Sequence, residues 1–120
     1  MSKKTVVIGA SENPERYSHK ASLALSANGH EVFPLGLREG KIDSLSILTG
    51  KPPLKDIHTV TLYVAAGKQS EWKSYVESLQ PRRVIFNPGT ENEEWMQALN
   101  RNHIEAIEAC TLVMLSLGTF

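Results

Sequence analysis

The sequence predicts a three-layer α/β fold in which helices cover both faces of a mostly parallel, five-stranded sheet. Short apolar runs rich in β-branched residues alternate with amphipathic helical stretches, and this alternation is typical of strands joined by crossover helices. The first run is apolar throughout, as expected of a parallel strand that is buried on both faces. Because crossovers between parallel strands are right-handed, we expect a doubly wound sheet with the strand order 3-2-1-4-5.

The first half of the chain contains two expected strands and one expected helix. Thr5–Ile8 is the continuously apolar first strand, and Glu31–Leu35 is the second. Between them, Ser18–Asn28 gathers apolar residues on one helical face, and Gly29 is suited to the left-handed cap that ends a helix. Leu37–His58 fits no single period and contains glycine and proline breakers, so we expect a meandering connection with a short helix or turn.

The second half continues the alternation of strands and helices. Its expected elements are a third strand at Thr59–Val64, a helix at Gln69–Leu79, a fourth strand at Arg83–Phe86, a helix that ends near Asn102, a fifth strand at Ile104–Ile107 and a short apolar tail at Cys110–Leu117 that forms a last helical turn or two on the sheet. Thr90 and Glu93 have the spacing of a capping box, which would open the helix before Asn102.

Length, charge and cysteine content limit the function classes. The 120 residues suit one domain, which we place at residues 1–120. Lys and Arg number 13, as do Asp and Glu, and this balance argues against nucleic-acid and membrane-surface binding, which need excess positive charge. The single cysteine, Cys110, can form no internal disulfide. The apolar run near the N-terminus is too short for a signal peptide or a membrane span, so we expect a cytoplasmic protein.

The turn after the first strand is a candidate phosphate-binding loop. In doubly wound sheets, ligands bind at the carboxyl ends of the strands, where the winding reverses. The small residues Gly9, Ala10 and Ser11 would let an anion approach backbone N–H groups, and the following helix points its positive end at the same place. Arg16 could add a charged contact. The alternative is that Gly9 only makes a tight strand–helix turn, and neither the G-x-G-x-x-G fingerprint nor the Walker pattern is present.

The end of the second strand bears on the choice of cofactor. NAD-binding domains usually place an acidic residue there to bind the ribose 2′-hydroxyl. Here Pro34–Leu37 is followed by Arg38, whose charge suits the ribose phosphate of NADP or of coenzyme A. The alternative for Arg38 is a solvated loop charge.

Two segments carry a family resemblance. They are Gly9-Ala10-Ser11-x-Asn13-Pro14-x-Arg16-x-Ser18 and, beyond Pro34, Asn87-Pro88-Gly89-Thr90-Glu91-Asn92-Glu93-Glu94. In both, the chain resembles the small single-domain CoA-binding proteins, which are similar to the CoA-binding domain of the succinyl-CoA synthetase α subunit. The resemblance covers nearly the whole chain. It implies a Rossmann-like domain that binds coenzyme A through the first loop, a basic residue after the second strand and the backbone after the third strand.

The binding residues so implied lie in three parts of the chain. They are Gly9, Ala10, Ser11, Asn13, Arg16, Tyr17, Ser18, Arg38, Val64, Ala65 and Ala66. The chain departs from the family pattern at Gly36-Leu37, where Asn-Pro is common, and at Glu108-Ala109, because an aspartate usually stands before the cysteine.

We therefore expect non-catalytic binding of coenzyme A or an acyl-CoA. The four histidines lack partners at metal-site or catalytic-triad spacing, although His19 lies beside the candidate loop, and Cys110 is expected to be a small buried packing residue. The main alternative is an NAD(P)-binding oxidoreductase or redox-sensing domain, with Tyr63 or His19 as the proton donor. A third interpretation is an interaction module that has lost its ligand. The apolar tail Leu112–Phe120 could be covered in a homodimer.

Overall fold

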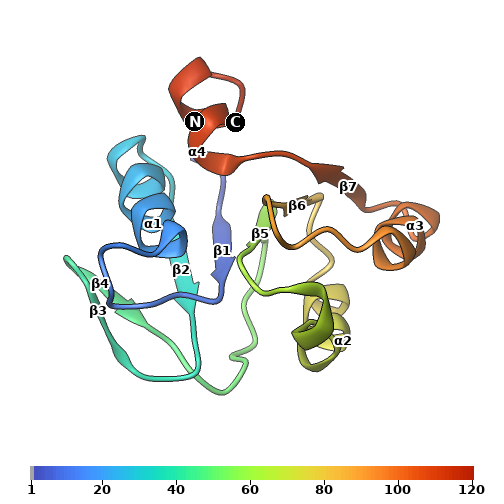
Figure 1. Ribbon diagram of the computed structural model, residues 1–120, viewed down its shortest axis with the longest axis horizontal. Coiled ribbons are helices and arrows are strands. Elements are labelled where there is room, and N and C mark those ends of the chain that lie inside the picture. Colours follow the sequence, from blue (N-terminus) through green and yellow to red (C-terminus); the bar gives the residue numbers. More distant parts are fainter. Residues whose placement is uncertain (1) are drawn as a thin grey trace.

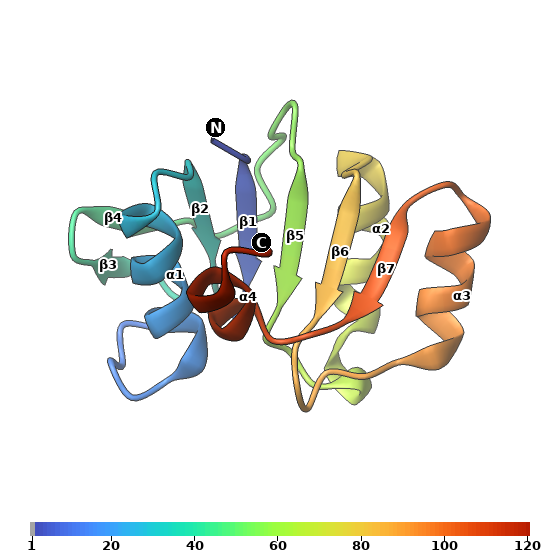
Figure 2. The same cartoon turned by 90° about the horizontal axis from the view of Figure 1, so that it is seen from above.

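The computed structural model describes residues 2–120, and a parallel five-stranded sheet lies between helices on both of its faces (Figures 1 and 2). The strands of this sheet are β1 (Thr5–Ile8), β2 (Val32–Leu35), β5 (Thr59–Leu62), β6 (Arg83–Phe86) and β7 (Glu105–Glu108), and β3 (Gly40–Ile42) and β4 (Leu45–Ile47) form a separate hairpin. The helices are α1 (Tyr17–Ala27), the 3-10 helix η1 (Ala66–Lys68), α2 (Ser70–Leu79), α3 (Glu93–Arg101) and α4 (Thr111–Leu117). This arrangement confirms the predicted α/β class.

The strand order is β2-β1-β5-β6-β7, and every neighbouring pair is parallel. The doubly wound class is confirmed, but the predicted order 3-2-1-4-5 is wrong, because β5 pairs with β1 rather than with β2. The outer edge of β2 is occupied instead by Leu48, whose N–H donates to the carbonyl oxygen of Pro34 at 2.8 Å. Pro34 has no N–H for a sheet ladder and is therefore suited to an edge strand, which is where β2 lies.

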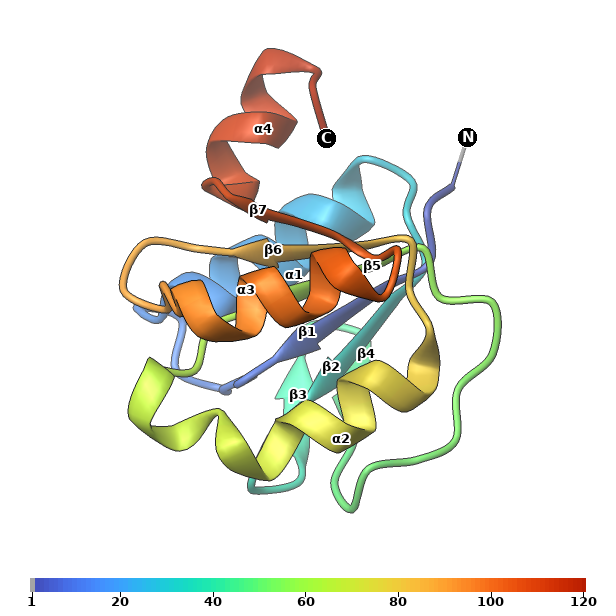
Figure 3. The ribbon, with the colours of Figure 1, turned by 90° about the vertical axis from the view of Figure 1, so that its right-hand side faces the viewer.

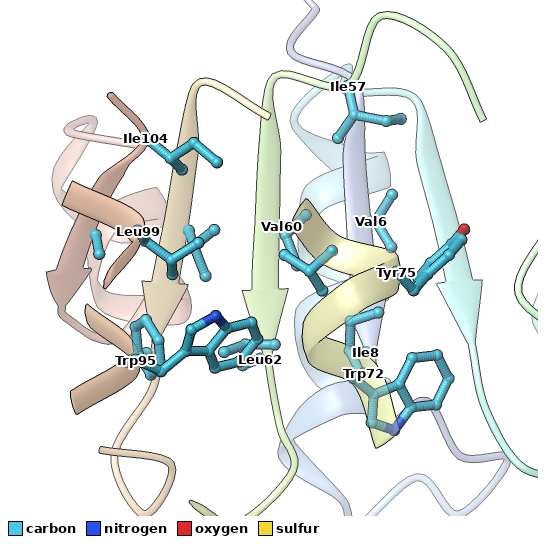
Figure 4. Close-up of a cluster of buried hydrophobic side chains, with 14 of the residues drawn as sticks. Val6, Ile8, Ile57, Val60, Leu62, Trp72, Tyr75, Trp95, Leu99 and Ile104 are labelled. Carbon is cyan, nitrogen blue, oxygen red and sulfur yellow. The ribbon is translucent and has the colours of Figure 1, made fainter. Parts of the chain in front are cut away.

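The larger core lies between the sheet and the helices α2 and α3 (Figure 4). Val6 and Val60 point into it from neighbouring strands, and Trp72 of α2 and Trp95 of α3 cover them. Both tryptophans are almost fully buried, and side chains of this size each bury about 150–250 Å². They hold α2 and α3 against the sheet, and both helices begin at its carboxyl edge because each follows the end of a parallel strand (Figure 2).

The opposite face of the sheet carries α1 and α4, which contact each other (Figure 3). Val7 of β1 packs there with Leu25 of α1, and the partly buried Phe120 closes the same cluster. Gly29 follows α1 with a φ of 85°, as predicted for its cap. The apolar tail forms the expected short helix, although α4 packs largely on α1. Among residues 2–120, no helix is long and apolar enough to span a membrane.

The β3–β4 hairpin replaces the meandering connection expected between β2 and β5. Ile42 and Ile47 are buried, whereas Asp43 and Ser44 are exposed and form the turn between the two strands. Asp43 adopts a φ of 55°, a conformation that aspartate tolerates better than most residues. Each strand has only three residues, too few for a period of two to be recognised in the sequence.

The predicted capping box of α3 is wrong. The cap is Asn92, whose side-chain oxygen accepts the N–H of Trp95 at 3.1 Å. Asn92 stands directly before the first helical residue, so its short side chain reaches the free N–H groups of the first turn. The hydroxyl of Thr90 donates instead to the carbonyl oxygen of Asn87 at 2.8 Å, and closes the turn that precedes the helix.

Candidate functional site

The carboxyl ends of β1, β2, β5 and β6 open into one cleft of about 1190 Å³. The winding of the sheet reverses at β1, because the chain passes from β1 to β2 on one side and returns to β5 on the other. Open α/β sheets bind their ligands at such a position. A smaller hollow of about 540 Å³ lies between the C-terminal ends of α2 and α3.

Most residues implied by the family resemblance line this cleft. They are Gly9, Ala10, Ser11, Arg16, Tyr17, Ser18, Arg38, Val64 and Ala65. The fold thus brings together three segments that are far apart in the sequence, which follow β1, β2 and β5.

Asn13 and Ala66 are not among the lining residues. Asn13 shapes the first loop instead, since its Oδ1 accepts the N–H of Glu15 at 3.0 Å and its carbonyl oxygen accepts the N–H of Arg16 at 3.0 Å. Ala66 begins η1, and the tight turn of this helix presents Lys68 to the cleft.

The first N–H groups of the loop are already used within the protein. Gly9 and Ala10 both donate to the carbonyl oxygen of Leu35, at 2.9 and 2.8 Å. Gly9 is required at its position because its φ is 95° and a Cβ there would lie 2.9 Å from the carbonyl oxygen of Tyr63. Gly9 and Ala10 therefore shape the bottom of the cleft, but their amides are not available to a phosphate.

Four amides beside them find no acceptor within residues 2–120, namely those of Ser11, Glu12, Tyr17 and Ser18. Tyr17 and Ser18 begin α1, and a capping side chain usually accepts hydrogen bonds from N–H groups at the start of a helix. The capping position is held by Arg16, whose side chain has no acceptor. Arg16 and the four residues with free amides all line the cleft. An anion bound there would therefore act as the missing cap and would also contact the guanidinium group of Arg16.

His19 anchors the loop to α1. Its ring is largely buried, and its Nδ1 lies 2.9 Å from the carbonyl oxygen of Ser11. A carbonyl oxygen can only accept, so Nδ1 carries the proton and donates. The sequence placed His19 beside the loop, and the structure assigns this nitrogen to holding the loop in shape.

Glu12 joins the same loop to the β3–β4 hairpin. Its carboxylate accepts the N–H of Lys41 at 2.8 Å, and a Cβ on Gly40 would collide with the Glu12 side chain. Gly36 is equally constrained, because a Cβ there would lie 2.6 Å from the carbonyl oxygen of Ala10. Neither glycine was recognised as a site residue from the sequence, because such close approaches between loops leave no local pattern.

Charged side chains of both signs surround the cleft. The cations are Arg16, Arg38 and Lys68, and the acids are Glu12, Glu15, Glu39 and Glu71. The cleft as a whole therefore has no excess of positive charge, and an anion bound there would depend on the free amides and on local contacts with the guanidinium groups.

Gln69 connects the two walls of the cleft that follow β5 and β6. Its side chain is fully buried, and its Nε2 donates to the carbonyl oxygens of Val64 at 2.8 Å and Thr90 at 2.7 Å. Its Oε1 accepts from Nδ2 of Asn92 at 2.9 Å. From the sequence, Gln69 was predicted only to begin a helix. A polar residue at the start of a helix whose side chain does not cap that helix is free to bond elsewhere. Only the structure shows that the Gln69 side chain does not cap α2.

Asn87 makes a similar connection beneath the cleft. Its Nδ2 donates to the Thr61 hydroxyl at 2.6 Å and to the Leu62 carbonyl oxygen at 2.8 Å, and its Oδ1 accepts the N–H of Thr111 at 2.9 Å. The hydroxyls of Thr61 and Thr111 are 2.8 Å apart. One buried amide thus joins the ends of β5 and β6 to the start of α4.

Tyr63 and Cys110 are reactive side chains that bear on catalysis. The hydroxyl of Tyr63 is buried and has no hydrogen-bond partner within residues 2–120, and burial raises the pKa of Tyr63 to about 12. Cys110 is partly exposed rather than buried, which corrects the expectation of a buried packing residue. Within residues 2–120, no group of three histidine, cysteine, aspartate or glutamate side chains is placed to hold a metal ion.

Comparison with known proteins matches both the sequence and the fold. The family model described as the CoA binding domain matches residues 3–116. A crystal structure of an uncharacterised protein is 44% identical, superposes with a TM-score of 0.97, and the match covers 100% of this chain and 99% of that one. A protein from Thermus thermophilus shares the fold with 21% identity and a TM-score of 0.80, and the match covers 99% of this chain and 91% of that one. A protein from Pyrococcus horikoshii OT3 shares it with 21% identity and a TM-score of 0.83, and the match covers 97% of this chain and 83% of that one. No curated protein matches the chain.

Proposed function

Because the chain belongs to the CoA binding domain family, we propose that it binds coenzyme A, or an acyl-CoA, in the cleft at the carboxyl edge of the sheet and does not transform it. The ligand would lie across the ends of β2, β1, β5 and β6, along which the lining residues are distributed. Adjacent strands are about 4.8 Å apart, so these four ends span about 14 Å, which calls for an extended ligand rather than a small anion.

The observation that carries this proposal is the uncapped start of α1. The free amides of Tyr17 and Ser18 lie with those of Ser11 and Glu12 in the cleft, beside the guanidinium of Arg16. Backbone N–H groups at a helix N-terminus favour phosphate, both by hydrogen bonding and through the helix dipole. We assign the pyrophosphate of coenzyme A to these donors.

The other implied contacts lie on the walls on either side of these donors. Arg38 lies in the bend after β2, is exposed to the cleft, and is the proposed ligand of the ribose 3′-phosphate. The backbone at Val64 and Ala65, after β5, is the third implied contact and would lie against the part of the cofactor that extends beyond the phosphates.

Binding without catalysis is supported by the state of the two groups that an oxidoreductase would need. Nδ1 of His19 is engaged with the carbonyl oxygen of Ser11. The buried hydroxyl of Tyr63, with its raised pKa, is a poor proton donor at neutral pH. The alternative, an NADP-dependent enzyme, shares the basic residue Arg38, since its charge would also suit a 2′-phosphate.

Composition and one exposed surface bear on where the protein acts and on how it assembles. A single cysteine and balanced charge suit a cytoplasmic protein that binds a small nucleotide rather than nucleic acid. Val113 and Leu117 are exposed on α4, and a homodimer could cover them.

Calorimetric titration with coenzyme A, acetyl-CoA, NAD and NADP tests the function. We expect coenzyme A and acetyl-CoA to bind more tightly than either dinucleotide. Tighter binding of NAD or NADP, or turnover of the reduced cofactor with a panel of carbonyl compounds, would replace this proposal with the oxidoreductase.

A further inference from the structure

The wall of the cleft at Pro88–Thr90 differs from the first loop in what it offers a ligand. Pro88 has no N–H, the N–H of Gly89 donates to Oε1 of Glu91 at 3.0 Å, and the N–H of Thr90 donates to the carbonyl oxygen of Asn87 at 3.0 Å. No amide within Pro88–Thr90 is free for a phosphate. This wall is therefore better suited to an uncharged part of a ligand whose phosphates occupy the first loop.

The position of this wall is set by a residue that does not line the cleft. Gln69 donates one N–H to the carbonyl oxygen of Val64 and the other to that of Thr90, and both of these residues are lining residues. The bond from Asn92 to the Gln69 oxygen fixes which way the amide faces. Every hydrogen-bonding atom of a fully buried side chain is thus used to hold two walls of the cleft at one separation.

The nucleotide end of the cleft is held by other bonds. The first loop is fixed by the contacts of Gly9 and Ala10 with Leu35 and by the contact of His19 with Ser11. None of these bonds passes through Gln69. A change at Gln69 should therefore alter the β5–β6 side of the cleft and leave the phosphate-binding loop intact.

We propose that Gln69 is a positioning residue that sets the β5 and β6 walls for the uncharged arm of coenzyme A, so that the site selects the whole cofactor over its nucleotide part. This inference rests on the proposed function. Coenzyme A differs from 3′-phospho-ADP by its pantetheine arm, which carries two amides and no charge. The wall at Pro88–Thr90, which lacks free phosphate-binding amides, suits that arm.

The substitution Gln69→Glu tests the role of the two donors at almost constant shape. A carboxylate cannot donate to the carbonyl oxygens of Val64 and Thr90 and would repel both. Protonation at low pH would return one donor, so the defect should itself depend on pH. Gln69→Met removes the donors without adding a charge and serves as the second variant if the first fails to fold. Gln80→Glu makes the same change at an exposed glutamine away from the cleft.

The experiment is calorimetry of the wild type and the three variants with coenzyme A and with 3′-phospho-ADP at neutral and at mildly acidic pH, with folding checked by circular dichroism. We expect Gln69→Glu to weaken coenzyme A binding about tenfold or more, as for a buried hydrogen bond lost, and to leave 3′-phospho-ADP binding within about twofold. The loss of coenzyme A affinity relative to the wild type at the same pH should be smaller at acidic pH for Gln69→Glu but not for Gln69→Met. Gln80→Glu should bind as the wild type does.

Three outcomes would overturn the inference, and they differ from a failure of the proposed function. Equal loss of both ligands in the Gln69 variants would show that Gln69 only stabilises the fold. Unchanged binding of coenzyme A would show that the two walls do not depend on it. Equal binding of the two ligands by the wild type would show that the arm makes no use of the far wall. Binding of neither ligand by the wild type would refute the proposed function itself, and this inference with it.

Discussion

The Nδ1 atom of His19 donates a hydrogen bond to the carbonyl oxygen of Ser11, across a distance of 2.9 Å. His19 belongs to the first turn of α1 and Ser11 to the loop before it, so this bond holds the loop against the start of the helix. As a result, the free amides of Ser11 and Glu12 lie in the same cleft as those of Tyr17 and Ser18. The proposed site for phosphate is thus formed before any ligand arrives.

Replacement of His19 should loosen this loop. In His19→Phe the carbonyl oxygen of Ser11 loses its donor, and we expect coenzyme A binding to weaken by about 1 kcal/mol, the usual net value of one hydrogen bond. In His19→Asn a side-chain N–H can take the place of Nδ1, so much of the affinity should return. Calorimetry of the two variants checks this, and wild-type affinity in His19→Phe would show that the bond has no part in binding.

The two arginines of the cleft should each contribute to binding. We expect Arg16→Ala and Arg38→Ala to weaken coenzyme A binding by about 1.5–3 kcal/mol each, the range for hydrogen bonds to charged groups. Arg101→Ala, on the exposed side of α3, is the control and should bind normally. If neither cleft variant differs from that control in a titration, the phosphates have been assigned to the wrong groups.

A methyl group at position 36 should be poorly tolerated. The Cβ of Gly36→Ala would lie 2.6 Å from the carbonyl oxygen of Ala10, so the loops after β1 and β2 must move apart. We expect a loss of about 1–3 kcal/mol in the free energy of unfolding, as for other overpacked sites. Gly67→Ala is a matched control, because nothing lies within 4 Å of its added Cβ. Urea unfolding of both variants decides the matter, and equal stabilities would contradict the close approach.

The N-terminal edge of the sheet should make stability depend on pH. The Nδ1 of His30 accepts the N–H of Lys3 at 3.0 Å, and the ring lies 5.0 Å from that of Phe120. Burial, followed by the charge of Lys3, lowers the pKa of His30 below 6.5, and burial and Arg83 lower the pKa of His58 in the same way. The folded protein therefore binds fewer protons than the unfolded chain as pH falls through about 6.5, and its free energy of unfolding should decrease.

Urea unfolding at about pH 7.5 and about pH 5.5 measures this dependence on the two sides of the histidine range. His30→Asn keeps an acceptor but does not titrate, and should lose less stability than the wild type over the same interval. A wild-type stability that rises on acidification, or a variant with the same pH dependence, would show that His30 is not the responsible group.

Much of the fold was predictable because its elements follow local rules. The apolar run Thr5–Ile8, the helical spacing of Trp72 and Tyr75 and the glycine after α1 each determine one element, and all three are confirmed. The position of β5 was not predicted, because strand order depends on which edge of β1 and β2 is free. Pro34, which has no N–H, is the residue that marks β2 as an edge strand. The short β3–β4 hairpin is held by Glu12, a contact that links residues 29 positions apart.

The candidate site was predictable as a set of segments but not as a set of donors. The sequence pattern shows small residues and Arg16 after β1. The structure brings these residues into one cleft with Arg38. Which amides are free could not be predicted, because it depends on the bonds of Gly9 and Ala10 to Leu35. Gln69 was missed for the same reason, since its three partners come from two loops, one after β5 and one after β6.

The claim that the free amides at the start of α1 hold the phosphates of coenzyme A is tested most directly by titrating isotope-labelled protein with coenzyme A and following each backbone amide by nuclear magnetic resonance. We predict that the largest changes occur at Ser11, Glu12, Tyr17 and Ser18 and that the amides of Gly9 and Ala10, which stay bonded to Leu35, change less. Saturable binding without changes at these four amides, or no binding of coenzyme A at all, would contradict the account.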